Sequence, residues 1–314
     1  MEQYKTLPRR VVILTSRQFE YLAVRTHVQV HTSDIEEHTG TVYELGSFAS
    51  ESNEDAWDVI LAEIDTGGPD AAVEAERAIR RYAPSLILFV GVAGGLETVH
   101  AGDVVVATKV YGYESGVVGE IFKSMPEVGN SSYRMQHRAK YVARMQTWQR
   151  RVGQTLPNPL PVAYVGPTAA GEKVLASKRT NLYTSLHEHY NDVLAVELGG
   201  HGFLKATHAH PDVYALIIRG IDGLISAKGY NYTQETQNNA ARHATAFAFE
   251  ILASLSNDPI FQKVKLNRQQ EQPGEKKEQS PSSKYTNNIR HVGTMIQGDH
   301  AHVTNNYGER NRKK

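Results

Sequence analysis

The chain has 314 residues, and the 40% that are hydrophobic are enough to bury a large core. Equal numbers of basic and acidic residues, 34 each, give no charge-based reason to expect a nucleic-acid or membrane partner. The absence of cysteine excludes disulfides and thiolate metal sites. The N-terminus leads into only a short apolar run at 11–14, too short for a signal peptide or a membrane span, so we expect a cytoplasmic protein.

Strand-like and helix-like segments alternate along the chain. Short apolar runs predict strands at 10–16, 58–65, 85–95, 102–110, 160–166, 192–198 and 212–220. Amphipathic patterns and capping residues predict helices from about residue 19 and over 67–84, 133–151 and 234–255. Continuously apolar strands that alternate with helices predict a three-layer α/β/α fold around a mostly parallel, mixed central sheet.

The composition changes near residue 258. Residues 259–284 are polar, contain Pro, Gly and Ser, and have too few large apolar side chains to fold alone. We therefore expect a catalytic domain over 1–258, a flexible linker over 259–284, and a short interaction segment over 285–314 in a disordered C-terminal tail.

The position of a ligand site follows from the predicted sheet. In open α/β sheets ligands bind at the carboxyl ends of the strands. We therefore expect the site to be built by the loops after Leu14, Ile64, Val90, Val165, Val196 and Ile218. The glycine turn at 91–95 lies at one of these ends, where glycine lets the backbone approach a ligand closely. This turn matches neither the dinucleotide fingerprint nor the Walker loop, and a tight strand exit would give the same pattern.

Six segments together carry a resemblance to a known family. The central one is LFVGVAGGLETVHAGDVVVATKVYGYE at 88–114. The others are SRQFEYLAV at 16–24, IDTGG at 64–68, AAGEKVLAS at 169–177, AVELGGHGFLKA at 195–206 and IIRGIDGLISAKG at 217–229. In this order they resemble the superfamily of nucleoside phosphorylases and methylthioadenosine/S-adenosylhomocysteine nucleosidases. The resemblance covers about 10–255 and implies cleavage of the N-glycosidic bond of a purine nucleoside or nucleotide, without a cofactor or a metal.

Three carboxylates are candidates for this chemistry. The leaving purine needs an acid beside it, an attacking water needs a carboxylate base, and the ribose hydroxyls need a third carboxylate. The resemblance assigns these roles to Asp222, Glu20 and Glu197 respectively. An aspartate that caps a turn and a glutamate on a solvated helix face are the structural alternatives for the first two.

Two departures from the family pattern bear on this assignment. The family has Ser-Asp where this chain has Asp222-Gly223, and a second glutamate where this chain has Gly199. Either a local shift restores the acid, or the chain is a catalytically degenerate nucleotide-binding module. The residues that the resemblance implies for substrate binding are Thr66, Gly67, Val92, Ala93, Gly94, Glu172, Lys173, Val174, Glu197, Leu198 and Arg219.

The attacking nucleophile depends on an anion site. Phe89 and Val92 stand where phosphorylases of this superfamily place an arginine and a serine. This difference favours hydrolysis, while phosphorolysis in purine salvage remains the alternative because Arg17 and Arg25 are available to a phosphate.

Basic residues suggest a nucleotide substrate. Five of them lie on the predicted helix 133–151, namely Arg134, His137, Arg138, Lys140 and Arg144. Lys173 lies in the segment 169–177, which resembles the purine-facing loop of the family. We name Arg17 and Arg138 as candidate phosphate ligands, although an ordinary solvated helix face would give the same pattern. The basic helix and the Tyr-x-x-Glu motif ending at Glu114 resemble a branch found in bacterial antiphage systems, which implies ATP as a candidate substrate that would release adenine.

Residues 291–306, HVGTMIQGDHAHVTNN, resemble short amyloid-forming signalling motifs. A short segment that bears Asn and Gln on a flexible tether can stack in register with its copies. This predicts recruitment by a sensor protein through 285–314, and the family resemblance implies a homo-oligomer, either a dimer or a hexamer. The histidine pairs His187/His189 and His208/His210 have no ligand set around them in the sequence, so we expect no metal site.

Overall fold

The computed structural model describes residues 7–49, 56–120, 122–125, 127–153, 157–256 and 258–262. The predicted interaction segment 285–314 and most of the predicted linker lie outside these residues. Phe261, three residues past the domain boundary expected at residue 258, is fully buried. It belongs to the strand β15 (Phe261–Gln262), which pairs with β1 (Leu7–Pro8).

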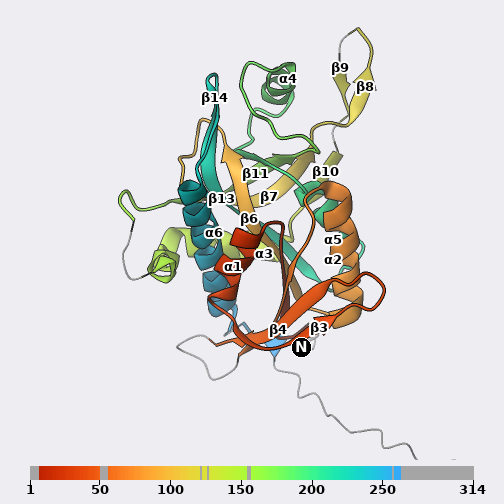
Figure 1. The fold of residues 1–314 in the computed structure, drawn as a ribbon, viewed down its shortest axis with the longest axis vertical. Helices are drawn as coiled ribbons and strands as arrows, with labels where there is room; N and C mark the ends of the chain where they lie inside the picture. The colour runs from red at the N-terminus through yellow and green to blue at the C-terminus, as the bar shows by residue number, and fades with distance from the viewer. Residues whose placement is uncertain are drawn as a thin grey trace, which may run out of the picture. The chain divides into compact units, whose positions relative to one another are not determined.

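A large mixed sheet forms the centre of the molecule (Figure 1). Its strands are β2 (Arg10–Thr15), β3 (Gln29–Ile35), β4 (Val42–Phe48), β5 (Trp57–Glu63), β6 (Leu86–Gly95), β7 (Val104–Gly112), β10 (Glu127–Asn130), β11 (Ala163–Ala170), β12 (Ala195–Glu197), β13 (Tyr214–Ser226) and β14 (Gly229–Asn231). The order β14-β13-β7-β11-β12-β6-β2-β5-β4-β3 includes parallel and antiparallel pairs, and β10 joins β7. Because β13 pairs with both β7 and β6, the strands β6, β13, β7, β11 and β12 form a closed ring of paired strands.

Helices cover both faces of this sheet. They are α1 (Gln18–Arg25), α2 (Gly68–Tyr82), α3 (Tyr133–Met145), α4 (Asn181–His189), α5 (Gly200–Thr207) and α6 (Gln234–Leu255), with a 3₁₀ helix at Thr147–Val152. A small hairpin of β8 (Gly116–Val118) and β9 (Phe122–Ser124) lies apart from the sheet. No helix in the described part of the chain is long and apolar enough to cross a membrane.

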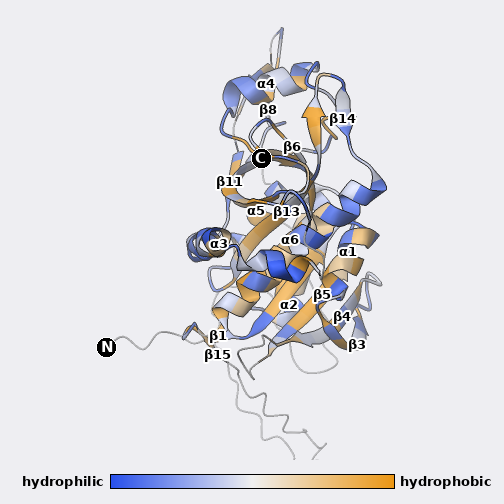
Figure 2. Cartoon of the chain, turned by 90° about the vertical axis from the view of Figure 1, so that its left-hand side faces the viewer, coloured by the Kyte–Doolittle hydropathy of each residue, from blue (hydrophilic) through white to orange (hydrophobic). Residues whose placement is uncertain are grey.

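Alternate residues of one strand show why three layers form. Val11 and Ile13 of β2 pack in the cluster that includes α6, whereas Val12 and Leu14 pack in the cluster that includes α2 and α5. All four side chains are fully buried, so β2 must be apolar throughout. Figure 2 shows the same division, with hydrophobic strands inside and hydrophilic residues on the outer parts of the helices. The three-layer prediction is confirmed.

Candidate active site

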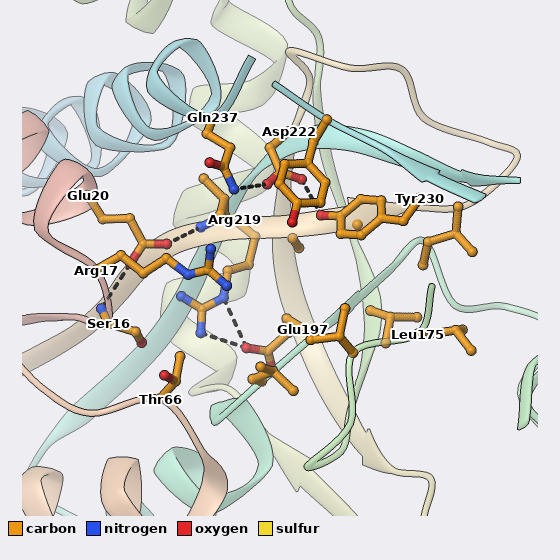
Figure 3. Close-up of a pocket in the computed structure, with 18 of the residues that line it drawn as sticks. Ser16, Arg17, Glu20, Thr66, Leu175, Glu197, Arg219, Asp222, Tyr230 and Gln237 are labelled. Carbon is orange, nitrogen blue, oxygen red and sulfur yellow. Dashed lines mark hydrogen bonds and ion pairs between the residues drawn. The ribbon is translucent and has the colours of Figure 1, made fainter. Parts of the chain in front are cut away.

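A pocket lies where the ends of β2, β6 and β12 meet the second half of β13 (Figure 3). Three of its lining side chains are carboxylates, Glu20, Glu197 and Asp222, and their residues are only 4%, 5% and 2% exposed. A buried carboxylate is stable only with partners that compensate for lost hydration. The partners of each carboxylate therefore indicate what it can do.

Glu20, in the first turn of α1, is held by the backbone. Its Oε2 accepts a hydrogen bond from the N–H of Ser16 at 2.9 Å, and its Oε1 accepts one from the N–H of Val92 at 2.8 Å. A Cβ on Gly91 would lie 2.6 Å from Glu20 Oε1, so glycine at that position permits the close approach. Burial raises the pKa of Glu20, whereas Arg219 and the two N–H groups lower it.

Glu197, at the end of β12, forms a buried ion pair with Arg219 of β13. Its Oε2 accepts hydrogen bonds from Arg219 Nη2 at 2.6 Å and from Nε at 3.0 Å. The guanidinium also lies over the ring of Phe89, 3.9 Å from its centroid. Burial raises the pKa of Glu197 and Arg219 lowers it, so the same arginine acts electrostatically on two of the three carboxylates.

Asp222 enters the pocket through a local irregularity of β13. The register between β13 and β6 shifts between Ile221 and Gly223, so Asp222 is the extra residue of a bulge, which redirects its side chain. Its Oδ1 accepts a hydrogen bond from the Tyr230 hydroxyl, and its Oδ2 accepts one from Gln237 Nε2 at 3.3 Å. Burial raises the pKa of Asp222, and these two hydrogen bonds lower it. The bulge thus brings the carboxyl to the site despite the unusual Asp-Gly order.

Most residues named from the sequence line this pocket. They are Arg17, Glu20, Thr66, Val92, Ala93, Gly94, Lys173, Val174, Glu197, Leu198, Arg219 and Asp222. Gly67 and Glu172 are not in the lining. Gly67 caps α2, and Glu172 Oε1 accepts the N–H of Gly68 at 2.9 Å, beside a separate hollow.

The basic helix does not supply a pocket residue. Arg138 on α3 donates to Asp258 Oδ2 at 3.0 Å, and Arg134 donates to both oxygens of the same buried carboxylate. The structure therefore gives Arg138 a partner in the scaffold, away from the pocket lining.

Several lining residues were not found by sequence reasoning. They are Ser16, Leu175, Val196, Ile225, Tyr230, Tyr232 and Gln237. Tyr230 lies on β14 and Gln237 in the first turns of α6, and neither belongs to a recognisable motif. The one available signal was Lys228-Gly229 directly after an apolar run, which is typical of a hairpin turn.

Within the described ranges, no group of three or more His, Asp or Glu residues is arranged to hold a metal ion.

Comparison with known proteins places this geometry in context. Residues 9–256 match the family model described as the Phosphorylase superfamily. The nucleosidase for 5'-methylthioadenosine and S-adenosylhomocysteine from Neisseria meningitidis, in complex with methylthio-immucillin-A, superposes with a TM-score of 0.63. It is 20% identical over 79% of this chain and 100% of its own.

Two further structures are similar. The corresponding nucleosidase from Streptococcus pneumoniae, in complex with 8-aminoadenine, has a TM-score of 0.62 at 20% identity and covers 78% of this chain and 100% of its own. Futalosine hydrolase from Helicobacter pylori has a TM-score of 0.61 at 17% identity over 77% of this chain and 97% of its own. No curated protein sequence matches the chain. At these identities, the structural likeness demonstrates a common fold.

Proposed function

The chain belongs to the phosphorylase superfamily, and we propose that it is an N-glycosidase that hydrolyses the N-glycosidic bond of a purine nucleoside or nucleotide. The observation that carries this proposal is the meeting of Glu20 and Asp222, each buried and differently surrounded, in one pocket. Similar structures with 8-aminoadenine or adenine bound support a purine as the leaving base.

The surroundings of the two carboxylates suit different roles. Burial raises the pKa of Glu20 as well, and Arg219 and two backbone N–H groups lower it. With an N–H donated to each of its oxygens, Glu20 is the candidate that accepts a proton from water. Burial raises the pKa of Asp222, so it keeps its proton to higher pH than an exposed aspartate and can give it to the departing base. Glu197 remains the candidate for the ribose hydroxyls, positioned by Arg219.

Hydrolysis fits this pocket better than phosphorolysis. The N–H of Val92 is already bonded to Glu20, and the Phe89 ring is covered by the Arg219 guanidinium. These two positions therefore offer no ligand to an attacking phosphate. A degenerate binding module is also disfavoured, because all three expected carboxylates line the pocket.

A nucleotide, with ATP as the first candidate, is the finer form of the proposal. Arg17 lines the pocket and is exposed, and Lys173 lines it while its Nζ bonds Glu114 Oε1 at 2.8 Å. The role that we propose is that of a cytoplasmic, homo-oligomeric effector in bacterial antiphage defence, recruited by a sensor through 285–314. This part rests on sequence resemblance, and the segment itself lies outside the described residues.

Base release tests the proposal directly. Purified protein is incubated with ATP, AMP, adenosine and methylthioadenosine, with and without phosphate, and free adenine is followed by chromatography. We expect phosphate-independent release that Asp222→Asn lowers by about 10²–10⁴-fold, whereas Asp192→Asn, outside the pocket lining, leaves it unchanged. Strict dependence on phosphate would instead establish a phosphorylase, and binding without turnover a degenerate module.

A further inference from the structure

A hairpin closes one side of the pocket. β13 continues past Asp222 to Ser226, turns, and returns as β14, so that Tyr230 pairs with Ile225. Gly229 starts the return with a φ of 131°, a conformation that glycine adopts readily. Tyr230 and Ile225 both line the pocket. The hairpin that begins after Asp222 therefore brings the Tyr230 hydroxyl back to the Asp222 carboxyl.

The residue after Asp222 makes this hairpin possible. A Cβ on Gly223 would overlap the carbonyl oxygen of Asn231, so only glycine lets β14 approach so closely. On the other side, a Cβ on Gly94 would lie 3.2 Å from Tyr230 Cε2, which shows that the tyrosine ring packs on the glycine turn. The glycine directly after Asp222 thus allows β14 to place Tyr230 beside Asp222.

Both oxygens of Asp222 have a side-chain donor. The Tyr230 hydroxyl bonds Oδ1 from β14, and Gln237 Nε2 bonds Oδ2 at 3.3 Å from the start of α6 (Figure 3). Each carboxyl oxygen has two lone pairs, so one side-chain donor on each oxygen still leaves the carboxyl able to carry a proton. Donors from two separate elements fix the carboxyl plane more firmly than either donor alone.

We propose that Tyr230 and Gln237 are positioning residues of the reaction, which orient Asp222 toward the base and stabilise its carboxylate after the proton has left. The inference rests on the proposed function. The proton passes from the Asp222 carboxyl to a ring nitrogen of the purine, and the C–N bond breaks with its electron pair on the base. Water bonds to the sugar carbon and gives its proton to Glu20. The Tyr230 O–H and the Gln237 N–H donate hydrogen bonds to the Asp222 carboxylate and stabilise its negative charge.

Arg17 is a charged group that also acts on Asp222, and its positive charge favours the carboxylate form. It is present in every variant compared below, so differences among the variants report the tyrosine alone. Tyr232 is the matched control, because it lines the same pocket, its ring centroid lies 4.8 Å from that of Tyr230, and among the described contacts it makes no hydrogen bond to Asp222.

The kinetic test compares Tyr230→Phe with Tyr232→Phe. Loss of one hydrogen bond to a developing charge predicts that Tyr230→Phe lowers kcat on the purine substrate by roughly tenfold, with little change in KM. The alkaline limb of its pH profile should move upward, because Asp222 without this donor keeps its proton to higher pH. With a 4-nitrophenyl riboside, whose leaving group needs no protonation, Tyr230→Phe should match the wild type. Tyr232→Phe should leave both limbs of the pH profile unchanged, whatever its effect on KM.

A second readout is independent of catalysis. The Asp222 carboxyl carbon is followed by NMR in ligand-free protein labelled at aspartate and assigned with Asp222→Asn. Tyr230→Phe should raise the titration midpoint of this signal and Tyr232→Phe should not. Gln237→Met, expected to act in the same direction, replaces Tyr230→Phe if that variant does not fold. If the wild-type protein releases no base, the proposed function fails, but the NMR titration still tests whether Tyr230 acts on Asp222. Equal titration midpoints in Tyr230→Phe and Tyr232→Phe would overturn the positioning role of Tyr230.

Discussion

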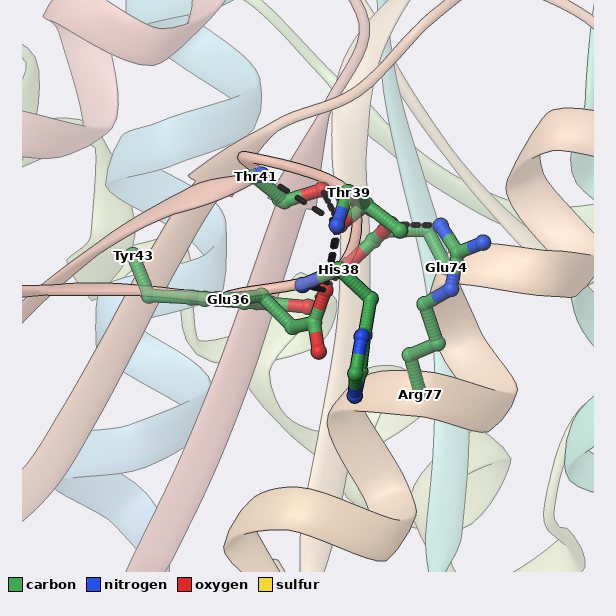
Figure 4. A network of polar contacts seen from close by, with 7 residues as sticks. All are labelled: Glu36, His38, Thr39, Thr41, Tyr43, Glu74 and Arg77. Atoms are coloured by element: carbon green, nitrogen blue, oxygen red, sulfur yellow. Dashed lines mark hydrogen bonds and ion pairs between the residues drawn. The ribbon is translucent and has the colours of Figure 1, made fainter.

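Two buried glutamates, Glu20 and Glu74, show how differently a carboxylate can be used within one fold. They are 4% and 5% exposed, and both oxygens of each accept hydrogen bonds. Glu20 is held by backbone N–H groups at the edge of a pocket that contains two more carboxylates. Glu74 is held by side chains, the Tyr43 hydroxyl, Thr41 Oγ1 at 3.4 Å and Arg77 Nη1 at 3.2 Å (Figure 4).

The partners explain the difference in role. The partners of Glu74 join α2 to β4 and to the turn before β4. In that turn, Glu36 Oε2 accepts hydrogen bonds from the N–H groups of His38 and Thr39 at 3.0 and 2.7 Å. Glu74 therefore links elements of the scaffold. The backbone partners of Glu20 fix the carboxylate beside Arg219 and leave it facing the other pocket groups. Burial alone does not identify a catalytic carboxylate; the groups that share its cavity do.

The largest expected effect comes from Glu20→Gln. The amide cannot accept a proton from water, so kcat for base release should fall by about 10²–10⁴-fold, with substrate binding largely retained. Steady-state kinetics and a binding measurement with a non-hydrolysable analogue separate the two quantities. A loss below about tenfold in kcat would remove Glu20 from the role of base.

Glu74→Gln should act on stability instead. The change removes the charge that faces Arg77 and places an amide among groups that donate, which should lower the free energy of unfolding by about 1–3 kcal/mol. Urea denaturation measures this loss, and kcat per folded molecule should equal that of the wild type. Glu36→Gln, in the exposed turn, is the control and should cost less than about 1 kcal/mol. A kcat that falls with Glu74→Gln would show that the two regions are coupled.

Much of the scaffold was predictable because its signals are local. The apolar runs gave β2, β5 and β6, and the helix expected over 234–255 is α6, whose start has a capping box at Thr233. The strand expected over 212–220 continues to Ser226, because pairing with β6 resumes after the bulge at a sequence that looks like a turn. The helix expected over 133–151 is interrupted at Gln146, where φ is 56°.

The site residues, too, were predictable where their signals are local in the sequence and were missed where they are not. Asp222, Glu20 and Glu197 were found because each follows an apolar strand in a family-like segment, and the structure places all three in one pocket. Tyr230 and Gln237 were missed because their contact with Asp222 depends on a hairpin and a helix start, which no spacing in the sequence reveals. Polar strands such as β3 were missed because five of its seven residues are exposed and give no apolar run.

A substitution at Arg17 should separate nucleotide from nucleoside substrates. Arg17 is an exposed cation that lines the pocket close to Glu20, and Arg17→Met would remove one ion pair with a substrate phosphate. Such a contact contributes about 1.5–3 kcal/mol, so KM for AMP or ATP should rise by roughly tenfold or more, while KM for methylthioadenosine stays within about twofold. Arg179→Met, an exposed arginine outside the pocket lining, is the matched control. An equal rise in KM for nucleotides and for methylthioadenosine would mean that Arg17 acts through Glu20 and Asp222, whose pKa values its charge also lowers. The nucleotide proposal would then lose its main support.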